Sequence, residues 1–177
     1  MQNPLVVAAV VFGVMEQVDF AFQHIGLERS EPLRCQPQQL DALWKTALVL
    51  VLNEQGEACR LSSQQYFYPA RNISLQRPAD ATFLGLHQEQ GFFAISVAMT
   101  QNNVTGTINI RSAASDWSSL QSSIFAQAKA LLHWQSQSKF CGRCGGLIDL
   151  KTAGYSAACS SCGLVTYPQC HPAVIMS

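Results

Sequence analysis

The sequence predicts an α+β protein in which an antiparallel, β-rich N-terminal domain with one long helix precedes a small C-terminal module. Three observations predict this arrangement: paired β-rich runs around turns, one stretch of helical periodicity, and a cluster of cysteines near the C-terminus. A chain of 177 residues has room for one medium domain and one small module. We therefore expect two structural units that differ in what stabilises them.

Two predicted hairpins define the N-terminal domain. The first joins residues 47–52 to residues 58–61 through a glycine-containing turn, and the second joins residues 82–86 to residues 92–97 in the same way. Apolar and β-branched runs on both sides of a short polar turn are typical of antiparallel hairpins. Between them, residues 66–68 are a further short strand candidate. These runs indicate a mostly antiparallel β domain.

Helical patterns flank these strands. Residues 41–46 predict a short helix after Pro37, and the polar residues 100–115 are typical of a connection. Asp116 is a good helix N-cap, and beyond it apolar residues recur at helical spacing over residues 116–136. The apolar stripe consists of Trp117, Leu120, Ile124, Phe125, Ala128, Leu131 and Leu132. We expect this helix to pack on the core and to connect the two units.

An apolar run also occupies residues 4–15. A transmembrane helix needs roughly 20 apolar residues, so this run is too short to cross a membrane. A secretory signal begins with a basic segment, and residues 1–3 carry no charged side chain. We therefore interpret residues 1–19 as a leader or a first strand.

The composition is that of a globular protein without a dominant charge. Hydrophobic residues make up 48% of the chain and charged residues 12%, which supplies enough apolar material for a core. Eleven Lys and Arg balance eleven Asp and Glu, so the chain lacks the basic field that sequence-independent nucleic-acid binding needs. It also lacks the run of like charges that favours a membrane surface. We expect no membrane partner.

Four of the seven cysteines carry the chemistry of the C-terminal module. Cys141 and Cys144 form one CxxC pair, Cys159 and Cys162 form the other, and 14 residues separate the two pairs. Two residues between thiolates allow one tight turn to present both sulfurs to the same ion, and two such knuckles complete the tetrahedron of a structural zinc site. A glycine follows each pair and lets the backbone turn sharply. We therefore predict one structural zinc ion in a small zinc ribbon.

Three other interpretations compete with a purely structural zinc ribbon. A thioredoxin-like redox pair needs one CxxC near a βαβ pattern, which the sequence lacks. Iron in a rubredoxin-like site uses the same ligands, and the spacing does not exclude it. A nucleic-acid-binding ribbon would carry basic and aromatic residues between the pairs, where only Lys151 and Tyr155 occur. Cys35, Cys59 and Cys170 are interpreted as structural residues of a protein in the reducing cytoplasm.

Catalytic signatures are missing, and we expect no catalytic residue in this chain. The motifs GxSxG, HExxH, GxxxxGKS/T and GxGxxG do not occur. His24, His87, His133 and His171 are isolated in the sequence, and the acidic residues do not group into a magnesium-binding cluster. A four-thiolate zinc site also has no open coordination position for chemistry.

The order of the C-terminal motifs resembles that of the NADH pyrophosphatase family of Nudix hydrolases. The motifs are Trp134, KFCGRCG at residues 139–145, the second CxxC pair, Tyr167-Pro168, and PAVI at residues 172–175. More diffuse similarity extends the resemblance to residues 20–177. The family pattern divides the chain into a β-rich N-terminal domain (20–115), a connecting helix (116–136), a zinc ribbon (137–168) and the start of a Nudix domain (169–177).

The resemblance implies an activity that this chain alone does not carry. In the family, a Nudix domain hydrolyses the diphosphate of NADH or NAD to nicotinamide mononucleotide and AMP, and some members also remove NAD caps from RNA. That domain holds Mg²⁺ or Mn²⁺ with the glutamates of an RExxEE motif, which is absent here. The resemblance thus implies the N-terminal, zinc-binding portion of a NAD(H) pyrophosphatase that is inactive alone. The alternative is a non-catalytic zinc-ribbon binding or scaffold protein.

The resemblance also implies substrate contacts and a partner. Tyr167 matches an aromatic residue that the family places near the nicotinamide side of the site. Arg111 matches a family arginine that could reach a phosphate. Family members are commonly homodimers, so we expect a cytoplasmic homodimer, with NAD-capped RNA as its one nucleic-acid substrate.

Overall fold

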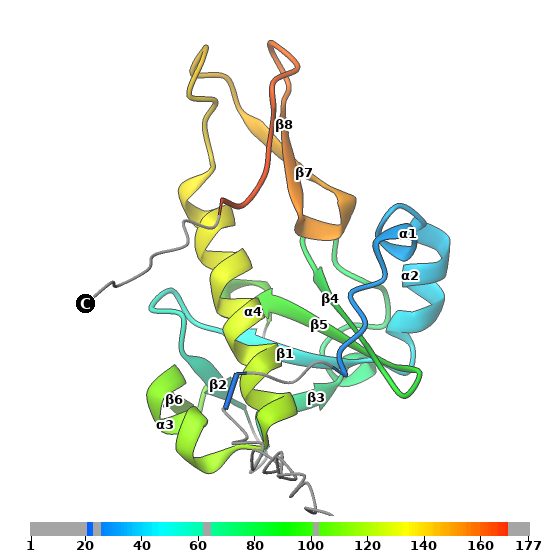
Figure 1. Cartoon of the computed structure of the whole chain (residues 1–177), viewed down its shortest axis with the longest axis vertical. Helices are drawn as coiled ribbons and strands as arrows, with labels where there is room; N and C mark the ends of the chain where they lie inside the picture. Colours follow the sequence, from blue (N-terminus) through cyan, green and yellow to red (C-terminus); the bar gives the residue numbers. More distant parts are fainter. Residues whose placement is uncertain (1–20, 23–25, 62–64, 101–102, 170–177) are drawn as a thin grey trace, which may run out of the picture.

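The computed structural model describes residues 21–22, 26–61, 65–100 and 103–169. They form a six-stranded sheet covered by helices, and a three-stranded ribbon stands on one end of this domain (Figure 1). The fold is α+β, as predicted. The expectations for residues 4–15, His24, Cys170, His171 and the PAVI motif at residues 172–175 fall outside the described residues.

Both predicted hairpins of the N-terminal domain are confirmed. The strands of the sheet are β1 (Leu48–Leu52), β2 (Ala58–Arg60), β3 (Phe67–Pro69), β4 (Thr82–His87), β5 (Gln90–Ser96) and β6 (Gly106–Ile108). Their order is β4-β5-β1-β2-β6, with β3 paired to β1. β1 pairs antiparallel with β2, and β4 pairs antiparallel with β5. The turn of the second hairpin is shorter than predicted: Gln88 and Glu89 both have positive φ, as two-residue hairpin turns require.

The two hairpins meet in a parallel pairing that the sequence did not predict. β1 runs parallel to β5, with Val49 opposite Phe93 and Val51 opposite Ile95. One parallel pair therefore lies at the centre of an otherwise antiparallel sheet. The hairpin patterns specify each pair of strands locally, but they contain nothing about how one hairpin meets the other.

The central strand β1 is buried on both faces of the sheet. Val49 and Val51 join the core that contains Trp44, whereas Leu50 and Leu52 join the core that contains Phe125. An unbroken apolar run such as LVLVL is typical of a strand that is covered on both faces. The sheet therefore has two cores, one on each side.

Four α-helices in the described part of the chain accompany the sheet, and their bounds correct two expectations. They are α1 (Glu31–Arg34), α2 (Pro37–Trp44), α3 (Ile110–Asp116) and α4 (Ser119–Gln137). The short helix predicted over residues 41–46 begins earlier, at Pro37, because a proline fits the first turn of a helix. The long helix does not use Asp116 as its N-cap. Ser118 caps it instead, in a capping box with Gln121.

The prediction of a connection over residues 100–115 is wrong, because this segment forms β6 and α3. β6 is an edge strand paired with β2, and its middle residue is exposed. In α3, Ala113 is the buried residue, and the Asn109 side chain caps the helix by accepting two backbone N–H groups. Elements that bury so little carry a polar composition, which explains why the segment reads as a loop. Among the described residues, no helix has the length and apolar character that crossing a membrane requires.

Candidate metal centre

The cysteines lie in a three-stranded antiparallel ribbon at the C-terminal end of α4 (Figure 1). Its strands are β7 (Ile148–Lys151), β8 (Ser156–Cys159) and β9 (Val165–Thr166). One CxxC pair precedes β7, and the other begins at the last residue of β8 and ends before β9. The pairing of β7 with β8 brings the two CxxC pairs to the same end of the ribbon.

The four sulfur atoms have the spacing of ligands around one ion. The Sγ atoms of Cys141, Cys144, Cys159 and Cys162 all lie within 4.8 Å of one another. The Cys141–Cys162 and Cys144–Cys159 sulfur pairs are 3.6 and 3.5 Å apart. A tetrahedron with zinc–sulfur bonds of about 2.3 Å has sulfur–sulfur edges of about 3.8 Å. The residues present therefore fit zinc, and no other such group of metal ligands occurs among the described residues.

The two CxxC turns are built alike. The N–H of Cys141 donates to the carbonyl of Gly146 at 2.8 Å, and the N–H of Gly145 donates to the carbonyl of Cys141. Gly163 makes the equivalent bond to Cys159 at 3.1 Å. Gly145 and Gly163 have φ values of 72° and 70°, a left-handed conformation that favours glycine. The sequence prediction that a glycine after each pair allows a sharp turn is confirmed.

Backbone amides and neighbouring sulfurs shift the pKa values of the Cys159 and Cys144 thiols in opposite directions. The N–H groups of Cys162 and Ser161 donate to Cys159 Sγ at 3.4 Å and lower the pKa of that thiol to about 6. At Cys144 the N–H of Gly146 lowers the pKa, but the close sulfurs of Cys159 and Cys162 outweigh it and raise the pKa to about 12. Four thiols this close do not all ionise without a compensating cation. A divalent ion supplies that compensation, and zinc takes tetrahedral thiolate ligands readily.

The far end of the ribbon is joined to the N-terminal domain by side chains of α4. Gln135 donates through Nε2 to the carbonyl of Gly154 at 2.8 Å and to Thr82 Oγ1 at 2.9 Å. Two helical turns earlier, Gln127 donates to the hydroxyl of Tyr155 and to the carbonyl of Leu84. The ribbon is therefore tied to the domain at its tip, as well as through the chain that follows α4.

Tyr155 is the central residue of this junction. Its ring packs against the core that contains Phe125, and the guanidinium of Arg34 lies 3.6 Å from the ring centre. Burial raises the pKa of the Tyr155 hydroxyl, and the positive charge of Arg34 counters part of that rise. The sequence offered Tyr155 only as one of two residues suited to nucleic acid. No pattern in the neighbouring sequence indicates its place in the junction, because the residues that contact Tyr155 come from three distant segments of the chain.

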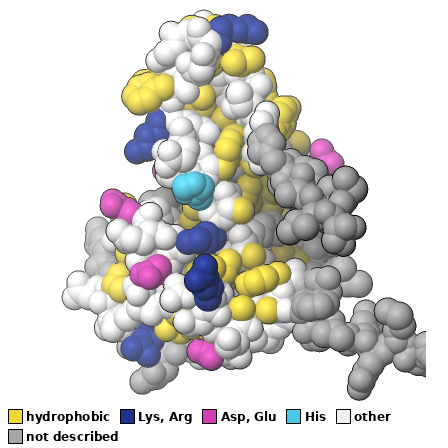
Figure 2. All heavy atoms as spheres, turned by 60° about the vertical axis from the view of Figure 1, so that its left-hand side comes forward, with side chains coloured by type: hydrophobic (Ala, Val, Ile, Leu, Met, Phe, Trp, Pro, Cys, Tyr) yellow, Lys and Arg dark blue, Asp and Glu magenta, His cyan; other side chains and the backbone are white. Residues whose placement is uncertain are grey.

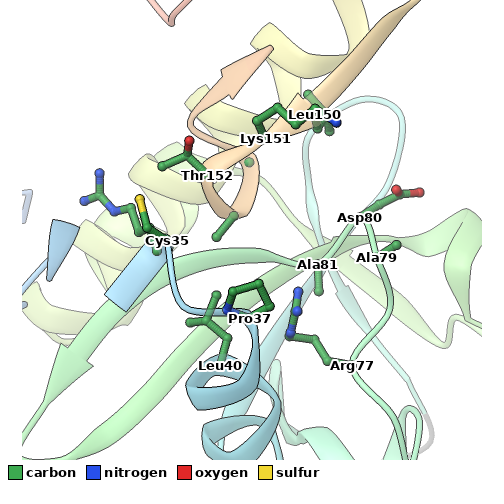
Figure 3. A pocket seen from close by; sticks show the side chains of 13 residues that line it. Cys35, Pro37, Leu40, Arg77, Ala79, Asp80, Ala81, Leu150, Lys151 and Thr152 are labelled. Atoms are coloured by element: carbon green, nitrogen blue, oxygen red, sulfur yellow. The ribbon is translucent and has the colours of Figure 1, made fainter. Parts of the chain in front are cut away.

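Two hollows lie beside this junction. A pocket of about 230 Å³ separates the α1–α2 segment from the ribbon tip. Figure 3 shows Cys35 and Pro37 on one side of it and Lys151 and Thr152 on the other. A groove of about 690 Å³ follows the C-terminal half of α4, between the β1–β2 turn and the root of the ribbon. Figure 2 shows that side of the molecule, where basic, acidic and hydrophobic side chains are interspersed.

The remaining sequence candidates lie apart from one another. Tyr167 follows β9 and its side chain is exposed. Arg111 is an exposed residue of α3, at the opposite end of the molecule from the ribbon (Figure 1). Helix α4 has 19 residues and therefore spans about 28 Å between those two ends. Cys59 is buried in the core and Cys35 is exposed at the end of α1, and neither joins the metal centre.

The ribbon matches a known family model. Residues 136–167 match the NADH pyrophosphatase zinc ribbon domain. The ribbon and its four cysteines thus define a zinc-ribbon protein with a structural metal site.

Curated relatives agree with this match. Nudix hydrolase 19, chloroplastic, of Arabidopsis thaliana is 39% identical over 69 residues, covering 36% of this chain and 16% of the relative. NAD(P)H pyrophosphatase NUDT13, mitochondrial, is 27% identical in Mus musculus, over 56% of this chain and 33% of the relative. The Homo sapiens protein of that name is 22% identical, over 74% of this chain and 51% of the relative. Together with the matched ribbon, these relatives support the resemblance to the NADH pyrophosphatase family. The chain spans about half or less of the length of the curated relatives it matches.

Proposed function

We propose that this chain is the N-terminal, zinc-binding portion of a Nudix NAD(H) pyrophosphatase. The observation that carries the proposal is the ribbon at residues 136–167, which matches the zinc ribbon of that family and holds its four cysteines within 4.8 Å of one another. In the proposed full protein, the zinc is structural and the chemistry belongs to a Nudix domain.

The proposed reaction of the full protein is hydrolysis of the diphosphate of NADH or NAD to nicotinamide mononucleotide and AMP. NAD-capped RNA is a further proposed substrate, and the proposed catalytic ions are Mg²⁺ or Mn²⁺ held by carboxylates of the Nudix domain. Tyr167 is the better supported substrate contact, because its exposed ring lies where the chain leaves the ribbon. Arg111 is less favoured, since α4 separates α3 from the ribbon (Figure 1).

The proposed assembly is a homodimer in a reducing compartment. Four thiols clustered for a metal, with none of the six described cysteines in a disulfide, support such a compartment. The cytoplasm is our proposal for it, although the relatives named above carry mitochondrial and chloroplastic names.

Two measurements test the proposed function. Reading the coding sequence beyond residue 177 should show a Nudix box, with its RExxEE glutamates, within the length of one further domain. The protein encoded in full should release nicotinamide mononucleotide from NADH with Mg²⁺ or Mn²⁺, whereas residues 1–177 alone should not. A coding sequence without that motif would favour the non-catalytic zinc-ribbon protein. Enzymatic turnover by residues 1–177 would contradict the proposal that catalysis belongs to the Nudix domain.

A further inference from the structure

The pocket between the α1–α2 segment and the ribbon tip is lined by more cationic than acidic side chains. Arg34 and Arg77 line it from the N-terminal domain, and Lys151 lines it from the ribbon. Asp80 is the one acid among the lining residues that the structure describes, and it forms no ion pair with any of these three cations. The lining therefore has an excess of positive charge, although the chain as a whole has none. A hollow lined mostly by one sign of charge attracts ligands of the opposite sign.

Each of the two arginines is held through Nε and leaves the rest of its guanidinium unpaired. Arg77 donates from Nε to the carboxylate of Asp41 at 2.8 Å, and Arg34 donates from Nε to the carbonyl of Arg29 at 3.0 Å. The terminal Nη atoms of both side chains have no acceptor among the described residues. These atoms carry most of the N–H donors of an arginine, so most of the donors at this pocket are available to a ligand.

Arg77 points most directly to a ligand. Its side chain is only 13% exposed, and polar groups buried to this extent nearly always have a hydrogen-bond partner. Figure 3 shows the Arg77 guanidinium between Pro37 and Ala81, at the wall of the pocket. Helix α2 begins at Pro37, so the positive end of its dipole lies on the same side. Because Asp41 already holds the guanidinium, little conformational freedom is lost when an oxyanion binds to it.

We propose that this pocket binds a small molecule that carries a phosphate monoester. Arginine pairs with phosphate oxygens through parallel N–H···O bonds, and the phosphate has enough oxygens for both arginines and for Lys151. The Lys151 ammonium is free to join them, because its contact with Asp149 is long, at 3.9 Å, and its side chain is 57% exposed. A phosphate monoester carries a charge of about −1.5 to −2 at pH 7, which suits the excess of cations in the lining.

The size of the pocket limits the rest of the ligand. Its volume is about 230 Å³, below the range of about 300–1,000 Å³ that is typical of sites for drug-sized ligands. The ligand is therefore a phosphate on a short carbon chain, and a nucleotide or a nucleic acid is too large to enter. None of the metal-centre cysteines, Arg111 or Tyr167 lines the pocket, so the site does not depend on the proposed pyrophosphatase activity.

A ligand in this pocket would contact both structural units. Arg34 and Arg77 belong to the N-terminal domain, whereas Lys151 and Thr152 belong to the ribbon tip. A ligand that binds only the folded chain stabilises it in proportion to the logarithm of the ligand concentration. Glycerol phosphate should therefore raise the melting temperature of the zinc-loaded chain in a saturable manner, with a dissociation constant of roughly millimolar for so small a ligand. Chloride at equal ionic strength should not.

Succinate tests the assignment to phosphate. It has a charge similar to that of a phosphate monoester, but it divides the charge between the two ends of a carbon chain. Fewer of its oxygens can reach both arginines together, so we expect weaker stabilisation than with glycerol phosphate.

Substitutions locate the site. Arg77→Gln should weaken the binding of glycerol phosphate by about tenfold or more, because it removes charge-assisted hydrogen bonds from a largely buried donor. Lys151→Gln should weaken it by about two- to fivefold, since an exposed ammonium contributes less. Arg71→Gln and Lys45→Gln are the matched controls, because both residues are exposed and lie outside the pocket lining. They should leave the affinity unchanged, and circular dichroism should show that all four variants are folded.

Cys35 gives a second, independent readout, because it is exposed and lines the pocket. A neutral maleimide should alkylate Cys35 more slowly when glycerol phosphate is bound, as measured by mass spectrometry of the peptide that contains it. Arg77→Gln should abolish most of this protection at the same ligand concentration. Stabilisation no greater than that by chloride, parental affinity in Arg77→Gln, or no protection of Cys35 would overturn the proposed site. Equal stabilisation by succinate would overturn the assignment to phosphate.

Discussion

The guanidinium of Arg34 lies 3.6 Å from the centre of the Tyr155 ring, and this contact joins α1 to the ribbon. The hydroxyl of Tyr155 accepts a hydrogen bond from Gln127 and donates to the carbonyl of Leu84 at 3.5 Å. One ribbon side chain thus contacts α1, α4 and β4. The ribbon is consequently part of the folded domain at its tip, while its metal centre lies at the other end.

Tyr155 should contribute to the stability of the whole chain. Tyr155→Ala removes a partly buried ring and its cation contact, and we expect a loss of about 2–3 kcal/mol in the free energy of unfolding. Tyr155→Phe removes only the hydroxyl bonds and should cost about 1 kcal/mol. Urea denaturation followed by circular dichroism measures both. Equal stability of the parent and Tyr155→Ala would show that the ribbon tip is not coupled to the domain.

The same residue gives a dependence on pH. Burial raises the pKa of Tyr155 in the folded chain, so the folded state keeps its proton after an unfolded tyrosine, with a pKa of about 10, has lost it. This contribution is complete below pH about 10 and is lost as the pH rises through the folded-state pKa. Comparison of the parent with Tyr155→Phe isolates it, because the other titrating groups are shared. The parent should lose stability more steeply than the variant in this range, and parallel curves would contradict the assignment.

Gln135 should hold the ribbon tip in place. Gln135→Ala leaves the carbonyl of Gly154 and the hydroxyl of Thr82 without their donor, at a cost of about 1–3 kcal/mol for partly buried groups. Hydrogen exchange should become faster in residues 152–156. Gln137→Ala, an exposed position on the same helix, is the matched control and should change neither quantity. An unchanged hydrogen-exchange rate in Gln135→Ala would mean that the backbone pairing of β7 with β8 holds the tip in place without the Gln135 hydrogen bonds.

Zinc should hold the metal end of the ribbon together. Structural zinc contributes on the order of 10–16 kcal/mol in such sites, far more than a module of this size gains from burial. Cys144→Ser or Cys159→Ser should therefore release the ion and disorder residues 140–165, while the N-terminal sheet stays folded. Cys35→Ser should keep the zinc, because Cys35 lies outside the metal centre. Elemental analysis measures the ion, and iron in its place or no metal at all would refute the assignment.

Two glycines of the ribbon should respond differently to substitution. Gly145 has φ +72° with nothing within 4 Å of an added Cβ, so Gly145→Ala costs only the backbone term of about 1–2 kcal/mol. Gly154 has φ +94°, and an added Cβ would lie 2.7 Å from both Gln135 Nε2 and Thr82 Oγ1. Gly154→Ala should lose a further 1–3 kcal/mol, roughly, from this crowding. Thermal denaturation measures the stability of the two variants. Equal losses would show that the Gln135 and Thr82 side chains move away from the added Cβ without a loss of stability.

In the proposed full-length pyrophosphatase, Tyr167 is the proposed substrate contact, and its substitution tests that role. An aromatic ring can stack on a nicotinamide ring with a gain of about 0.5–1.5 kcal/mol beyond burial. Tyr167→Ala should therefore raise KM for NADH roughly three- to tenfold with a smaller effect on kcat, because stacking is equal in the ground and transition states. Tyr167→Phe should be nearly silent. A stable Tyr167→Ala enzyme with parental KM and kcat would remove Tyr167 from the site.

Sequence reasoning succeeded where a structure depends on neighbours along the chain. The two hairpins and the cysteine knuckles are such features, since turn residues and a two-residue spacing specify them locally. It failed for β6 and α3, whose few buried residues leave a polar composition. It also failed for the β1–β5 pairing and for Tyr155, because each depends on partners from distant segments. The metal centre was therefore predictable residue by residue, while the junction that attaches the ribbon to the domain was not.

The parallel pairing of β1 with β5 also bears on the order in which the N-terminal domain folds. Each hairpin is local and can form within microseconds. To bring Leu48 opposite Phe92, however, the chain must close a loop of roughly forty residues, and non-local pairings of this kind slow folding. We therefore expect the slow step in the folding of this domain to be the pairing of β1 with β5, since both cores depend on that pairing.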